Sequence, residues 1–86
     1  MDLDDQLRRY FGSADLAAIP PAAVEAGVER MKVDLGLETD RANRFALWAL
    51  LHMFGSAPDL DIVFPDERDR EAARNFMDLA AQSGGT

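Results

Sequence analysis

Residues 45–54 read Phe-Ala-Leu-Trp-Ala-Leu-Leu-His-Met-Phe, and Gly55 follows. Nine of these ten residues are apolar, although the whole chain carries a net charge of −7. A helix that is apolar on almost every side must be surrounded by protein. We therefore expect this segment to form the central helix of a small helical bundle or one half of a subunit interface.

The flanking sequence contains further apolar residues at the spacing of one helix face. They form three sets: Leu3, Leu7, Tyr10 and Phe11; Val24, Val28, Met31 and Leu35; and Ala72, Ala73, Phe76, Met77 and Ala80. This spacing predicts an all-α, single-domain bundle of four main helices. These helices cover about residues 3–11, 21–35, 40–54 and 66–81, with a short helical turn near 14–18.

Glycines and prolines mark the expected ends of these helices. Gly12 and Gly36 suit the position after a helix, where a left-handed backbone is common. Gly27 lies inside the second helix, either because another helix approaches closely there or as a tolerated defect that costs about 1 kcal/mol relative to alanine. Residues 56–65 are expected to form a packed loop or a helical turn, and residues 82–86 a disordered tail.

Composition limits the classes of function. The 86 residues include no cysteine and one histidine, which excludes disulfides and a zinc site built from cysteine and histidine. Sixteen acidic residues against nine basic ones argue against direct nucleic-acid binding and against an anionic membrane surface. The same charge favours a basic protein partner.

The expected location is the cytoplasm. The N-terminus, Met1-Asp2-Leu3-Asp4-Asp5, lacks the basic start and apolar run of a signal peptide. The apolar segment 45–54 is shorter than the roughly 20 residues that span a bilayer. Eight arginines to one lysine, with abundant alanine, suggest a GC-rich bacterial gene.

The sequence offers no catalytic constellation. His52 is the only histidine, and a functional histidine needs a nucleophile, a carboxylate or further metal ligands beside it. No serine lies in a nucleophile motif of the G-x-S-x-G type. The carboxylates after Asp59 do not follow a calcium-loop pattern, because Phe64 takes the place of its glycine. We therefore expect no catalytic residue, cofactor or metal.

Three functions agree with these observations. The first is a small acidic, non-enzymatic protein-interaction module: a regulator, an inhibitor or a small subunit. Its candidate interaction surface comprises Asp59, Asp61, Asp66, Glu67, Leu47, Leu51 and Phe54. The second is a homo-oligomer, such as a homodimer, that pairs surplus apolar surface of the central helix at Leu47, Leu50, Leu51 and Phe54. The third is a small-molecule binder that uses the aromatic core near Trp48 and His52.

Overall fold

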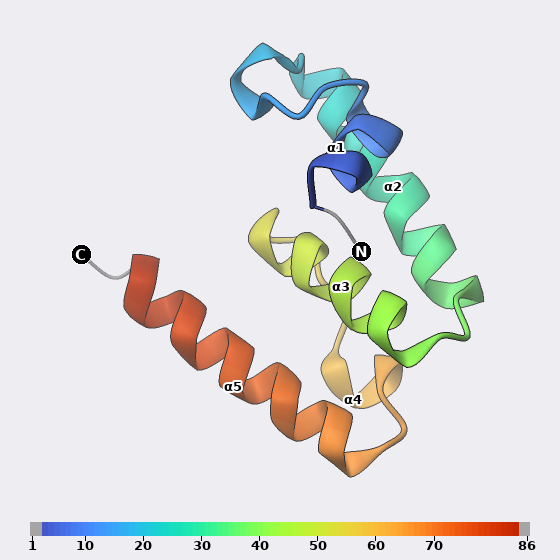
Figure 1. The fold of residues 1–86 in the computed structure, drawn as a ribbon, viewed down its shortest axis with the longest axis vertical. Helices are drawn as coiled ribbons and strands as arrows, with labels where there is room; N and C mark the ends of the chain where they lie inside the picture. Colours follow the sequence, from blue (N-terminus) through green and yellow to red (C-terminus); the bar gives the residue numbers. More distant parts are fainter. Residues whose placement is uncertain (1–2, 85–86) are drawn as a thin grey trace.

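The computed structural model describes residues 3–84, and every regular element in that range is helical. The prediction of a small all-α bundle is therefore confirmed (Figure 1). The elements are α1 (Leu3–Phe11), the 3-10 helix η1 (Leu16–Ala18), α2 (Pro21–Leu37), α3 (Arg41–Met53), α4 (Leu60–Val63) and α5 (Glu67–Gly84).

Aspartate side chains cap the N-terminal ends of several of these helices. Asp15 accepts a hydrogen bond from the amide of Ala17, and Asp40 accepts one from the amide of Asn43. At the start of α4, the side chain of Asp59 accepts a hydrogen bond from the amide of Asp61. Such caps satisfy amides that have no partner inside the helix, and each stabilises its helix by about 1 kcal/mol. Three of the sixteen acidic residues therefore have a structural role as helix caps.

The α3 helix lies between two pairs of helices. It packs against α2 on one side and against α5 on the other, while α1 packs on α2 and α4 on α5 (Figure 1). Trp48 and Leu51 of α3 are almost fully buried, together with Met31 of α2 and Phe64 after α4. The apolar segment 45–54 is thus central, as its sequence indicates.

The contact between α1 and α2 depends on Gly27. A Cβ atom built on Gly27 would lie 2.2 Å from Cε1 of Phe11 and 2.8 Å from the backbone oxygen of Tyr10. The end of α1 therefore occupies the space that a side chain would need. This settles the two interpretations of Gly27 in favour of a close helix approach.

Two helices extend beyond their predicted ends. The α2 helix continues through Gly36 to Leu37, because Gly36 keeps a helical backbone and does not adopt a positive φ. The α5 helix continues to Gly84, so residues 82–84 are helical and the predicted tail was wrong there. Residues 85–86 of that tail lie outside the described residues. Within the segment 56–65, the helical turn α4 confirms one of the two expected forms.

Within residues 3–84, no helix combines the length and the apolar character that crossing a membrane requires.

Gly27→Ala should lower the free energy of unfolding by about 1–3 kcal/mol, because the added methyl group overpacks the contact between α1 and α2. Gly36→Ala is the matched control, since its Cβ would meet no atom within 4 Å. It should raise stability by about 0.4–1 kcal/mol. Urea unfolding followed by Trp48 fluorescence measures both. Equal effects of the two substitutions would contradict the close approach.

Candidate functional site

Arg44 joins three parts of the chain through backbone carbonyl groups. Its Nη1 atom donates to the oxygen of Leu35 at 3.1 Å and to that of Glu38 at 2.8 Å. Its Nη2 atom donates to the oxygen of Val63, at the end of α4. The guanidinium group therefore satisfies carbonyls at the ends of two helices, which otherwise lack partners within the helix.

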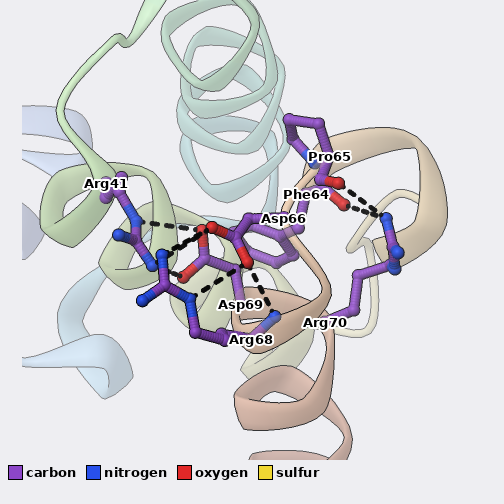
Figure 2. Close-up of polar contacts among 7 residues, drawn as sticks. All are labelled: Arg41, Phe64, Pro65, Asp66, Arg68, Asp69 and Arg70. Carbon is purple, nitrogen blue, oxygen red and sulfur yellow. Dashed lines mark hydrogen bonds and ion pairs between the residues drawn. The ribbon is translucent and has the colours of Figure 1, made fainter.

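Two further side chains hold the segment between α3 and α5. The indole nitrogen of Trp48 donates to the oxygen of Pro58 at 3.1 Å. Arg70 donates to the oxygens of Phe64 and Pro65 at 3.0 and 2.9 Å (Figure 2). Three carbonyls of this segment are thus bound to side chains of α3 and α5, which fixes its course between the two helices.

The N-terminal ends of α3 and α5 meet in a cluster of ion pairs (Figure 2). Arg41 forms two hydrogen bonds with Asp69, of 3.2 and 2.8 Å, and Arg68 contacts Asp66 at 3.0 Å. The hydrogen bonds from Arg68 lower the pKa of Asp66 to about 2. The hydrogen bond to Asp69 raises the pKa of Arg41. We call Arg41, Asp66, Arg68 and Asp69 the charge cluster.

The predicted acidic run is largely balanced by arginine. Asp61 lies 3.7 Å from Arg74, and Glu67 contacts both Arg70 and Arg74, at 2.6 and 3.3 Å. These hydrogen bonds, that from Arg70 foremost, lower the pKa of Glu67. Asp59 serves as the cap of α4. Residues 41–74 contain six acidic residues and five arginines, so this part of the chain is close to neutral.

The three apolar residues of the predicted surface have different positions. Leu47 and Leu51 are 2% and 0% exposed, so their assignment to an interaction surface was wrong. They lie on the sides of α3 that the chain's own helices cover. Phe54 remains partly exposed, and its ring packs 5.1 Å from that of Phe11.

His52 contacts aromatic rings. It stacks on Trp48 with centroids 5.5 Å apart and meets Phe76 edge-on at 5.8 Å. Within residues 3–84, its imidazole forms no hydrogen bond or ion pair, and no group of three or more His, Asp or Glu residues is arranged to hold a metal ion. The ring thus extends the aromatic core toward the surface.

A polar pocket of about 440 Å³ lies where α1, α2 and the start of α3 meet. Tyr10 forms one wall, and its hydroxyl group donates a hydrogen bond to Asp34. Burial and this hydrogen bond raise the pKa of Tyr10 to about 12. The carboxylate of Glu38, another wall residue, accepts hydrogen bonds from the amides of Thr39 and Asp40. Both carboxylates are therefore engaged within the chain.

The excess of negative charge lies in the first half of the chain. Residues 4–40 contain eight acidic and four basic residues. A groove of about 450 Å³ runs between α2, which belongs to this half, and the end of α3. It is lined by Val24, Glu25, Val28, Glu29, Lys32, Phe54 and Ser56. We call it the acidic groove, because Glu25 and Glu29 stand on its α2 side.

The sequence contains a signal for this groove that the periodicity of apolar residues does not reveal. Glu25 and Glu29 are four residues apart, so they share one side of α2, next to the apolar stripe that holds Val24 and Val28. The other wall comes from Phe54, which is distant in the sequence, and only the packing of α2 on α3 brings it there. Of the predicted surface residues, Phe54 alone belongs to this groove.

Comparisons with models of protein families, with curated protein sequences and with solved structures gave no match for this chain.

Arg44→Met should lower the free energy of unfolding by about 2–4 kcal/mol, because three carbonyl groups lose a charged donor. Arg41→Met is the control: it removes an arginine of the same helix whose side chain is 58% exposed, and it should cost less than about 1 kcal/mol. Urea unfolding separates the two cases. Similar losses would show that Arg44 acts only through surface charge.

The chain has one tyrosine, so its ultraviolet absorbance reports the ionisation of Tyr10 directly. The phenolate should appear near pH 12, not near pH 10. Because the folded pKa is raised, the associated stability is present below pH 10 and is lost as the pH rises through 12. Asp34→Ala should lower the titration midpoint. An ordinary midpoint in the native protein would contradict the contact between Tyr10 and Asp34.

Proposed function

We propose that this chain is a non-enzymatic protein-interaction module that binds a basic, amphipathic segment of another protein in the acidic groove. The observation that carries the proposal is that one hollow is lined both by the apolar residues Val24, Val28 and Phe54 and by the carboxylates of Glu25 and Glu29. Apolar contacts provide affinity in such sites, while charge on the rim provides orientation and rate of association.

The base of the groove supports the apolar part of this recognition. Val28 is buried, whereas Val24 and Phe54 are partly exposed and remain open to a ligand. An aromatic ring beside aliphatic groups is a common anchor site at protein interfaces. The ring of Phe54 is held by its contact with Phe11, so the base of the groove is formed before binding.

The rim supports the charged part. Glu29 lies 3.5 Å from Lys32, and its side chain is 73% exposed. Glu25, one turn earlier, forms no ion pair among the described residues. An incoming lysine or arginine therefore gains a partner at Glu25 and competes with only one exposed lysine at Glu29. Exposed pairs of this kind contribute little stability to the chain itself, so they are exchanged at small cost.

The helical wall of the groove favours a helical ligand. One wall is α2, and residues four apart on a helix present a repeat that a second helix matches with residues at i, i+3, i+4 and i+7. A partner helix with basic residues on one edge and aliphatic residues on its inner face satisfies both parts of the groove. Such a segment also associates rapidly with an acidic protein at low salt.

The test compares capture of proteins from a cell lysate by the native chain and by two double variants. Glu25→Gln with Glu29→Gln removes the rim charge. Glu71→Gln with Asp78→Asn removes the same charge from α5 and is the matched control. The native chain should retain a basic partner at low salt and release it at high salt. The rim variant should weaken binding about tenfold, which corresponds to roughly 1.4 kcal/mol.

The control variant decides between a site and a general charge effect. If both double variants weaken binding equally, net charge alone is responsible and the acidic groove is not the site. If neither weakens it, the partner binds elsewhere. Phe54→Ala tests the base of the groove. It should leave the rate of association unchanged and accelerate dissociation.

A further inference from the structure

The polar pocket where α1, α2 and the start of α3 meet contains hydrogen-bonding groups that the chain does not use. Its volume of about 440 Å³ lies in the range of small-molecule sites. Its polar walls are Gln6, Arg9, Tyr10, Asp34, Glu38 and Asn43. The acidic groove shares none of its lining residues with this pocket, so the two are separate sites on the molecule.

One hydrogen-bond acceptor in this region is buried without a partner. The side-chain oxygen of Gln6, a wall residue of the pocket, is shielded from solvent, and no group of the described residues donates a hydrogen bond to it. Native proteins rarely leave a buried acceptor unsatisfied, because such an atom has lost its hydrogen bonds with water and gained none in return. The oxygen of Gln6 therefore takes a donor from a molecule outside the chain.

Two carboxylates of the pocket each keep one oxygen without a partner. The hydroxyl group of Tyr10 donates to Oδ2 of Asp34, and two backbone amides donate to Oε1 of Glu38. Within residues 3–84, the second oxygen of each carboxylate forms no hydrogen bond or ion pair. Together with Gln6, the pocket therefore provides three unused acceptors. A primary ammonium group has three N–H donors to offer them.

The pocket also provides a cation that has no acidic partner. The guanidinium carbon of Arg9 lies 5.6 Å from the centroid of the Tyr10 ring, and among the described residues Arg9 forms no ion pair. Asp34 lies at the hydroxyl group of the same ring, so opposite charges stand beside one tyrosine without pairing with each other. A guanidinium group binds a carboxylate through two parallel hydrogen bonds. The anionic group of a ligand therefore has its own partner here.

We propose that the polar pocket binds a free aliphatic α-amino acid, with its ammonium group at the three unused acceptors and its carboxylate at Arg9. A ligand with only a positive charge leaves Arg9 without a partner, and a ligand with only a negative charge faces two carboxylates. The zwitterion satisfies both ends of the pocket at once. Its side chain lies against Leu37 and Leu47, which form the apolar part of the wall.

Calorimetric titration of the full chain with L-alanine, L-valine and L-leucine tests the proposal. At least one of them should bind with a dissociation constant below about 1 mM. L-Leucinamide, which lacks the carboxylate, and N-acetyl-L-leucine, which lacks the ammonium group, should each bind at least about tenfold more weakly than L-leucine, because each loses one charged partner.

Two substitutions test the two ends of the pocket separately. Arg9→Met should weaken amino-acid binding about tenfold. Arg30→Met is the matched control, because Arg30 lies 5.7 Å from the same ring centroid of Tyr10 but does not line the pocket. Asp34→Asn should also weaken binding, since it removes one charge from the ammonium end while it keeps an acceptor for Tyr10. Circular dichroism confirms that each variant folds.

NMR spectra of the side-chain amides locate the ligand in the native protein. The chain has four carboxamide side chains: Gln6, Asn43, Asn75 and Gln82. The bound amino acid should shift the signals of the first two, which line the pocket, and should leave unchanged those of the last two, which belong to α5.

Three results would overturn the proposal: no binding of any of the three amino acids, equal binding of L-leucine and either of its one-charge analogues, or equal effects of Arg9→Met and Arg30→Met. The double variant Glu25→Gln with Glu29→Gln should leave amino-acid binding unchanged, because neither residue lines this pocket. Failure of the pocket and failure of the acidic groove are therefore distinguishable.

Discussion

The arrangement of the helices depends on the guanidinium group of Arg44. It lies where the end of α2, the start of α3 and the end of α4 come together, and it donates to a carbonyl of each neighbouring segment. Arginine suits this place because its donors are fixed in one plane and it stays charged at any ordinary pH. With Trp48 bonded to Pro58 and Arg70 bonded to Phe64 and Pro65, it fixes the path by which the chain leaves α3 and enters α5.

The acidic residues have three separate roles in this molecule. Aspartates such as Asp40 begin helices, carboxylates such as Asp69 pair with arginines, and only the remainder is left to act on other molecules. This division explains why the carboxylates of the densest acidic run in the sequence are largely paired with arginines. A count of charges identifies the sign of a partner, but the contacts of each carboxylate decide where that partner binds.

The features that the sequence predicted well are those that depend on local patterns of apolar residues. Periodicity over residues 3–11, 21–35 and 66–81 depends on neighbours within a few turns, and the helices follow it. Because α3 is apolar on almost every side, its sequence did not reveal which sides the chain covers, so Leu47 and Leu51 were wrongly placed on a surface. The acidic groove was missed because its walls come from Glu25 and Phe54, which only tertiary packing brings together. The extension of α5 to Gly84 shows that serine and glycine near a helix end do not stop it by themselves.

The order in which the helices pack has a consequence for how quickly the chain reaches its native state. α1 meets α2, α2 meets α3, and α4 meets α5, so most contacts join elements that follow one another along the chain. The longest connection between two packed helices is residues 54–66, between α3 and α5, and it contains the helical turn α4. A topology with such low contact order is typical of proteins that fold in microseconds to milliseconds. The chain therefore spends little time with its unusually apolar central helix exposed to aggregation.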